Sequence, residues 1–195
     1  MVVRDIVLAS ASPRRRELIK KIKCVNPIFT ATDAEETVLP TAQATATVNA
    51  RKKGERAAEH THLPVLAFDT VVGLGTRVFG KPTSREEAIS MFETLCGHTH
   101  EVVTAVFLKV GEKIIEKFEK TSVTFGAFNA RLVYNYVDSG APYDKAGGYN
   151  IDDPQIKPLI ERVDGDYYNV VGLPVALTEK LIEENLFYGE DGDCA

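Results

Sequence analysis

Tryptophan is absent from this sequence of 195 residues, and cysteine occurs only as Cys24, Cys96 and Cys194. Three widely spaced cysteines without CxxC spacing indicate neither a disulfide framework nor a zinc site. No apolar stretch approaches the roughly 20 residues that cross a bilayer. The N-terminus also lacks the charged-then-apolar order of a secretory signal. We therefore expect a cytoplasmic protein with no membrane partner.

An excess of positive charge is missing as well. The sequence has 23 Lys and Arg against 28 Asp and Glu, a formal net charge of -5. Proteins that bind nucleic acids generally carry a strongly basic face, so we expect no nucleic-acid partner. Hydrophobic residues make up 44% of the chain, and a chain of this size hides roughly 70% of its unfolded surface. Stability therefore requires neither a disulfide nor a structural metal.

Several familiar site patterns are also absent. The sequence has no GxxxxGK[ST] motif, and no GxGxxG follows the first apolar run, which excludes the two common nucleotide-binding fingerprints. Ser10 and Ser12 have no evident histidine-acid relay, which argues against a serine hydrolase. His98 and His100 are spaced so that one strand face could present both to a metal. Without a third ligand nearby, we interpret them as hydrogen-bonding residues instead.

The spacing of apolar residues predicts a chain in which strands and helices alternate. Strands are predicted at residues 6–10, 65–72, 102–108, 113–118 and 122–125. Helices are predicted from residue 13 onward and at residues 43–59, 84–95, 129–137 and 174–185. A hairpin is predicted around Asp164-Gly165.

These elements predict a mixed α/β (α+β) fold in which a mixed, twisted sheet is covered by helices. Pairing signals of both kinds occur, because some strands follow one another closely and others are separated by helices. We expect one domain over residues 1–188, with a cleft between two lobes, and a frayed tail over residues 189–195.

The segment SASPRRR, residues 10–16, is typical of an anion site at the start of a helix. Ser12 is a good N-cap residue, and proline is favoured at the position after it. Arginines in the first turn oppose the helix dipole by about 0.3–1 kcal/mol each, unless an anion binds there. Backbone N–H groups, serine hydroxyls and guanidinium groups would together bind phosphate. A solvated basic helix face is the alternative.

Asp69 interrupts an otherwise apolar strand, VLAFDTVV. An unpaired carboxylate buried there would cost several kcal/mol, so something must compensate for it. A divalent metal would do so, as would a reaction in which the carboxylate accepts a proton from water. A structural salt bridge is the alternative. The acidic run at residues 33–36 could bring a second carboxylate to Asp69 and complete a magnesium site, or could simply be solvated.

Three lysines could place positive charge over a cleft. Lys81 lies in a Gly-Lys-Pro turn, Lys145 precedes a pair of glycines, and Lys53 lies in the predicted helix at residues 43–59. Such charges would neutralise phosphate oxygens. Lysines are also common on solvated surfaces, so each alone is a weak signal.

Six motifs follow one another in order along the chain: LASASPRRREL (8–18), FDTVV (68–72), GKP (80–82), LCGHTHEV (95–102), DKAGGY (144–149) and VVGLP (170–174). Together they resemble the Maf family of nucleoside triphosphate pyrophosphatases. The resemblance implies an elongated two-lobed fold with a deep central cleft, similar to inosine triphosphate pyrophosphatases. It also implies metal-dependent hydrolysis of a nucleoside triphosphate to the monophosphate and pyrophosphate, and it is compatible with a homodimer.

The resemblance further implies roles for individual residues. Those that would hold the substrate are Ser10, Ser12, Arg14, Arg15, Lys53, Lys81 and Lys145. Glu35 and Asp69 would position the divalent cation, which is Mg2+ or alternatively Mn2+ or Co2+. Asp69 would also accept the proton from the attacking water. Glu36 is the alternative to Glu35, because the surrounding loop fixes the register poorly.

Arg14 together with Thr70 resembles the branch of the family that prefers dTTP and UTP. That branch has Gly-Ile-Gln where this chain has Asn150-Ile151-Asp152. An aspartate accepts hydrogen bonds but cannot donate one as an amide does. We therefore expect Asp152 to weaken recognition of uracil or thymine, or to favour a base that offers donors, such as cytosine.

Two rival functions stay open at this point. One is a nucleotide-binding regulatory module with little turnover, linked to cell division or septum formation. The other is a pyrophosphatase acting on deaminated purine nucleotides. A regulatory binding module would need the basic cluster, but it gives no reason to place Asp69 in an apolar strand.

Overall fold

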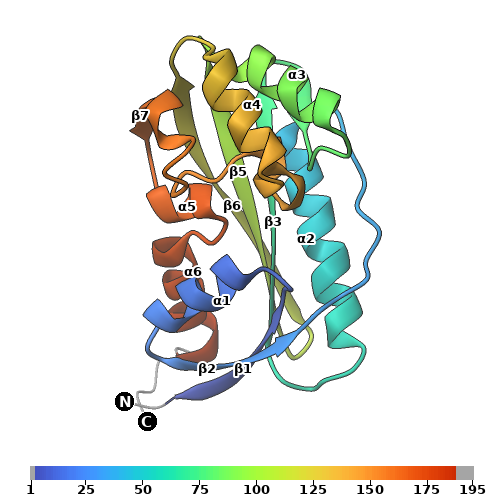
Figure 1. The fold of residues 1–195 in the computed structure, drawn as a ribbon. Coiled ribbons are helices and arrows are strands. Elements are labelled where there is room, and N and C mark those ends of the chain that lie inside the picture. The colour runs from blue at the N-terminus through green and yellow to red at the C-terminus, as the bar shows by residue number, and fades with distance from the viewer. Residues whose placement is uncertain (1–2, 188–195) are drawn as a thin grey trace.

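A mixed seven-stranded sheet runs through the long dimension of the molecule (Figure 1). The computed structural model describes residues 3–187. The strand order is β2-β1-β3-β5-β6-β7, with β4 paired to β3. β1 is parallel to β2 and β3, and the remaining pairs are antiparallel, which confirms the predicted mixed sheet. The strands are β1 Arg4–Ala9, β2 Val25–Thr30, β3 Val65–Leu74, β4 Arg77–Phe79, β5 Thr99–Val110, β6 Lys113–Phe125 and β7 Ile160–Asp164.

Six α-helices of the described residues surround this sheet. They are α1 Pro13–Leu18, α2 Ala42–Ala58, α3 Arg85–Leu95, α4 Ala130–Asp138, α5 Tyr167–Val171 and α6 Val175–Ile182. Short turns of 3-10 helix occur at Ile19–Lys21, Ala141–Asp144, Ala146–Gly148 and Lys157–Leu159, and a π-helical turn follows α6 at Glu183–Phe187. In Figure 1, α3 and α4 lie at one end of the molecule, α1 and α6 lie at the other, and α2 runs along its side.

Each end of the molecule has its own hydrophobic core. Under α3 and α4 the core is built around the stacked rings of Phe92 and Phe125. Between α1, α6 and β1 it is built from aliphatic side chains such as Ile6, Ile19 and Ile182. A third cluster joins α2 to the middle of the sheet. This division produces the two lobes that the sequence predicted.

Helix α2 packs closely on the sheet because the face that it buries carries small residues. Ala42, Ala46, Ala50 and Ala57 are all buried there. Gly54 continues this face, and a Cβ atom at that position would lie 2.1 Å from the ring of Phe107. The close approach matters for the site, since α2 also carries functional side chains toward β3.

Two of the predicted elements differ in the structure. β6 is one continuous strand, where the sequence predicted a break after residue 118, because residues 113–124 pair with β5 without interruption. The predicted hairpin at Asp164-Gly165 is wrong. Asp166 Oδ1 accepts a hydrogen bond from the Tyr168 amide at 2.7 Å and so begins α5 directly after β7.

Other parts of the prediction also differ. The sequence pattern missed β2, an edge strand that contains Pro27, which is tolerated there because an edge leaves one side unpaired. The predicted tail at residues 189–195 lies outside the described residues, and the assignment of residues 1–188 to one domain stays a prediction.

A buried asparagine fastens α5 to the sheet. The Asn169 side chain accepts from the Thr104 amide at 3.1 Å and donates to the Val102 carbonyl and to Thr121 Oγ1, both at 3.0 Å. Thr104 Oγ1 in turn donates to the Asn169 carbonyl at 2.9 Å. Because Asn169 is fully buried, these bonds replace its contacts with water.

Replacing Asn169 with alanine should lower the free energy of unfolding by about 3 kcal/mol, because it leaves the Thr104 amide and the Val102 carbonyl buried without partners. Urea unfolding measures this. Asn129→Ala is the matched control: Asn129 is exposed and caps α4, so its loss should cost about 1 kcal/mol. Equal effects from the two variants would contradict this account of Asn169.

Candidate active site

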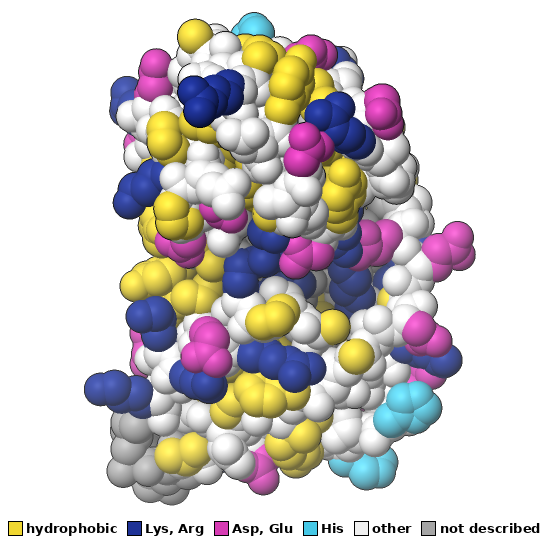
Figure 2. Space-filling view, in the orientation of Figure 1, with side chains coloured by type: hydrophobic (Ala, Val, Ile, Leu, Met, Phe, Trp, Pro, Cys, Tyr) yellow, Lys and Arg dark blue, Asp and Glu magenta, His cyan; other side chains and the backbone are white. Residues whose placement is uncertain are grey.

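A cavity of about 520 Å³ opens between the two lobes. In Figure 2 it is seen as a hollow across the middle of the molecule where Lys, Arg, Asp and Glu side chains gather. Its walls come from the end of β1 and the start of α1, the loop before α2, the buried face of α2, β3, the turn at Gly80-Lys81, and the segments at residues 143–150 and 170–172. The predicted cleft is thus present, and its volume suits a small-molecule ligand.

Asp69 lies at the centre of this cavity. β3 is buried on both faces, and Asp69 itself is 5% exposed. Its Oδ1 atom is 2.5 Å from the Lys53 ammonium, and its Oδ2 accepts a hydrogen bond from Asn49 Nδ2 at 3.4 Å. Burial raises the pKa of Asp69 above its ordinary value, against the opposing charges of Lys53 and Arg15. The carboxylate is therefore a stronger base than an exposed aspartate.

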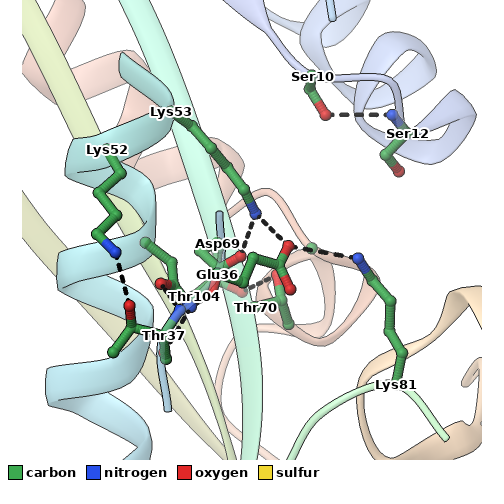
Figure 3. Close-up of polar contacts among 12 residues, drawn as sticks. Ser10, Ser12, Glu36, Thr37, Lys52, Lys53, Asp69, Thr70, Lys81 and Thr104 are labelled. Atoms are coloured by element: carbon green, nitrogen blue, oxygen red, sulfur yellow. Dashed lines mark hydrogen bonds and ion pairs between the residues drawn. The ribbon is translucent and has the colours of Figure 1, made fainter. Parts of the chain in front are cut away.

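Glu36 brings a second carboxylate to the same lysine. Its Oε1 lies 2.7 Å from Lys53 Nζ and 3.4 Å from Lys81 Nζ (Figure 3). Burial raises the pKa of Glu36, but the hydrogen bonds and charges of Lys53 and Lys81 outweigh it and hold the pKa below the ordinary value. The Glu36 carboxyl therefore loses its proton at a lower pH than an ordinary glutamate does.

Glu35, which the resemblance put forward, is placed differently. Among the described residues, Glu36 lines the cavity and Glu35 does not. Glu36 contacts Lys53, which also pairs with Asp69. The geometry therefore favours Glu36, the alternative that the sequence left open.

The start of α1 forms the opposite wall of the cavity. Ser10, Ser12, Arg14 and Arg15 all line it. The Ser12 amide donates to Ser10 Oγ at 3.2 Å, which shapes the turn into the helix. Arg14 Nη1 lies 3.5 Å from an oxygen of Asp144 across the cavity mouth.

Arg15 is anchored by the protein itself. Its Nε donates to the Gly172 carbonyl at 2.8 Å, and its Nη2 donates to Thr70 Oγ1 at 2.9 Å. Thr70 Oγ1 is in turn 3.0 Å from Thr104 Oγ1. Burial lowers the pKa of Arg15. Arg15 thus ties α1 to β3 and to the end of α5, and it adds positive charge to the cavity wall.

Two further predicted residues, Lys145 and Asp152, lie in the segment at residues 141–152. Lys145 lines the cavity and donates to the Ala141 carbonyl at 2.5 Å, with Asp144 as its ion-pair partner. Asp152 is exposed and accepts a hydrogen bond from Tyr167 Oη. Among the described residues that line the cavity, Asn150 is present but Asp152 is not.

A divalent cation fits the residues at the centre of the cavity. In the described part of the chain, no cluster of three or more His, Cys, Asp and Glu could hold a metal. Two carboxylates, those of Asp69 and Glu36, nevertheless meet at one ammonium group. Mg2+ characteristically binds one or two carboxylates and takes its other ligands from water and substrate phosphates. An oxygen pair of this kind suits such an ion.

The two histidines prove to be structural. His98 Nδ1 is 3.1 Å from the Cys96 carbonyl, and His100 Nε2 is 2.8 Å from Tyr149 Oη. His100 is 1% exposed and packs edge-on against Phe125. Burial lowers the pKa of His100 to about 4. These contacts agree with the interpretation of both histidines as hydrogen-bonding residues, which was made from the sequence.

The low pKa of His100 should make stability depend on pH. The unfolded chain takes up a proton near pH 6.5, whereas the folded chain does so only near pH 4. Stability is therefore lost as the pH falls through this window, by about 3 kcal/mol in total. Urea unfolding from pH 7 to pH 4 measures it. His100→Gln should flatten the dependence, and the exposed neighbour variant His98→Gln should retain it; a dependence unchanged in His100→Gln would contradict the assignment.

Comparison with known proteins gives a consistent picture. The family model described as Maf-like protein matches residues 5–185. A protein named dTTP/UTP pyrophosphatase from Pyrococcus furiosus is 40% identical over 93% of this chain and 95% of its own. Another of the same name, from Exiguobacterium sibiricum, is 41% identical over 91% of each chain.

Solved structures support the fold. The Ham1 protein from Staphylococcus aureus has a TM-score of 0.54 at 16% identity, covering 92% of this chain and 98% of its own. A HAM1 protein from Coxiella burnetii has a TM-score of 0.51 at 19% identity, covering 94% and 100%. None of the helices in the described residues has the length and apolar character needed to cross a membrane.

Proposed function

The chain belongs to the Maf-like protein family, and on that basis we propose that it is a nucleoside triphosphate pyrophosphatase. It would hydrolyse the bond between the α-phosphorus and the oxygen that bridges to the β-phosphorus. The observation that carries the proposal is a buried carboxylate, Asp69, in a cavity whose lining also includes Arg14, Arg15, Lys53, Lys81 and Lys145. A site that only binds phosphate has a use for the cations but none for that carboxylate.

The proposed reaction consists of one displacement at the α-phosphorus. Water attacks, the bond to the bridging oxygen breaks, and the electron pair of that bond leaves with pyrophosphate. Asp69 accepts a proton from the attacking water, for which its raised pKa suits it. Lys53 and Lys81 neutralise the charge that collects on the leaving group. The products are the nucleoside monophosphate and pyrophosphate.

The remaining residues would bind and orient the triphosphate. Ser10, Ser12 and Arg14 face the cavity from the start of α1, and Lys145 faces it from the opposite lobe. We propose that Asp69 and Glu36 hold a divalent cation, Mg2+ or alternatively Mn2+ or Co2+, which would neutralise phosphate charge when bound.

For the base, we propose a pyrimidine. The relatives named dTTP/UTP pyrophosphatase support this choice, as does the resemblance of Arg14 and Thr70 in the sequence to the branch that prefers dTTP and UTP. CTP belongs in the substrate panel because Asp152 replaces the glutamine of that branch, although Asp152 lies outside the described cavity lining and accepts a hydrogen bond from Tyr167. The biological role proposed is removal of unwanted nucleotides from the cytoplasmic pool, by a protein that works as a homodimer.

The experiment is pyrophosphate release from a panel of canonical, methylated and deaminated nucleoside triphosphates, with Mg2+ or Mn2+ supplied. Equal amounts of monophosphate and pyrophosphate from dTTP or UTP are expected. Preferential turnover of deaminated purines would replace the pyrimidine proposal. Tight binding of nucleotide with no turnover of any substrate would instead favour a regulatory module linked to division or septum formation.

A further inference from the structure

We propose that Asn49 is a positioning residue of this site, holding the loop that carries Glu36 against the strand that carries Asp69. The inference rests on the proposed function. Asn49 lies on α2 one helical turn before Lys53, so both side chains lie on the face that meets β3. No motif in the sequence indicated it.

The amide of Asn49 uses both of its polar atoms. Its Oδ1 accepts from the Thr37 amide at 2.8 Å, and its Nδ2 donates to the Thr37 carbonyl at 3.1 Å. The same Nδ2 donates to Asp69 Oδ2 at 3.4 Å. Asn49 is 3% exposed and lines the cavity. One buried side chain therefore contacts both the loop and the central carboxylate.

These bonds determine where Glu36 lies. The segment at residues 31–39 has neither helix nor strand to fix it. Two hydrogen bonds to one residue fix both the position and the rotation of the Thr37 backbone, and Glu36 is its immediate neighbour. With Thr37 held in this way, the Glu36 carboxylate reaches Lys53 and Lys81.

Only an amide of this length satisfies all three partners. The Thr37 amide needs an acceptor, while the Thr37 carbonyl and the Asp69 carboxylate need donors. Asparagine has one acceptor and two donor hydrogens, whereas leucine has neither and aspartate has acceptors alone. A residue that served only to fill space on the buried face of α2 would not need this chemistry.

A matched control exists one turn earlier on the same helix. Thr45 Oγ1 accepts from the Leu39 amide at 2.9 Å and donates to the Leu39 carbonyl at 3.2 Å. Thr45 is also 3% exposed. It thus tethers the same loop from the same helix, but its hydrogen bonds go to Leu39 and to the Thr41 carbonyl, not to Asp69.

The test compares Asn49→Leu with Thr45→Val in the full chain. Mn2+ affinity is measured by calorimetry without nucleotide, kcat and KM are measured with dTTP, and thermal unfolding reports stability. Asn49→Leu should weaken Mn2+ binding and lower kcat, each by about 10- to 100-fold. Thr45→Val should change Mn2+ affinity by less than about twofold, since the carboxylates keep their support.

Several outcomes would overturn the inference. Wild-type Mn2+ affinity and kcat in Asn49→Leu would do so, as would equal losses in both variants, which indicate a loop tether alone. If Asn49→Leu does not fold, the smaller variant Asn49→Ser takes its place. If the wild type turns over no nucleotide, the proposed function fails, while the comparison of Mn2+ affinities still decides the role of Asn49.

Discussion

Replacing Asp69 with asparagine should lower the rate of pyrophosphate release by about 100- to 10,000-fold, the range typical of a lost general base. The amide has the same shape but cannot accept the proton of the attacking water. The measurement is kcat for dTTP at saturating substrate and metal. Because the change conserves volume, the cavity around Lys53 should keep its form.

The same variant should be no less stable than the wild type. Burial raises the pKa of Asp69 in the folded chain, so the folded state favours the neutral form more than the unfolded chain does. The ionised carboxylate therefore costs stability above its ordinary pKa, and the amide removes that cost while Lys53 keeps its ion pair with Glu36.

Asp164→Asn, at an exposed position at the end of β7, is the control and should retain activity. Activity undiminished in Asp69→Asn, with the variant folded, would assign Asp69 to a structural salt bridge instead.

Lys53→Met should lower kcat by about 100- to 1,000-fold, the loss expected when one preorganised charge is taken from a transition state. Lys53 Nζ joins the carboxylates of Asp69 and Glu36, and its side chain is 14% exposed. Without it those carboxylates face each other with no ammonium between them. The free energy of unfolding should therefore fall too, because removing one partner of a buried ion pair strands the other.

The neighbouring lysine supplies the comparison for Lys53. Lys52 donates to Thr37 Oγ1 at 2.6 Å, and in the described chain it is outside the cavity lining. Lys52→Met should change kcat by only a few-fold, since it removes one tether of an exposed loop. If both variants lost activity equally, the loop, rather than the charge of Lys53, would be the important element.

Local signals in the sequence predicted much of the fold. The helix predicted at residues 84–95 forms as α3, and Ser84 Oγ caps it by accepting from the Glu87 amide at 3.1 Å. Asp69 stood out because a single charge broke an apolar run, and the structure buries it as that pattern indicated. Signals of this kind depend mainly on neighbours in the chain, which the sequence shows directly.

The elements that were missed depend on distant partners. The hairpin expected at Asp164-Gly165 has suitable turn residues, but Gly165 lies against Thr121 of β6, and the chain continues into α5. Likewise β2, with its proline, forms because β1 offers it an edge. Turn and strand propensities contain no information about which distant strand is available.

The candidate site shows the same division between features that local signals predict and features that depend on distant partners. Ser10, in the turn between β1 and α1, and Lys53, in α2, line the cavity. The choice between Glu35 and Glu36 could not be made from the sequence, because hydrogen bonds between Asn49 and the loop set the register there. The resemblance assigned Arg15 to substrate binding. Its hydrogen bond to the Gly172 carbonyl could not be predicted either, because neither segment contains a signal that pairs it with the other.

The bond between Arg15 and the Gly172 carbonyl, which spans 157 positions, has a consequence for the order in which the protein is made. A ribosome releases α1 long before α5. In a nascent chain, the Arg15 guanidinium group therefore has no Gly172 carbonyl to bind until residue 172 has emerged. Contacts of such long range are established late. A growing chain can thus expose every charged group of the cavity before the wall at residues 170–172 exists, and the candidate site becomes complete only after that segment has emerged.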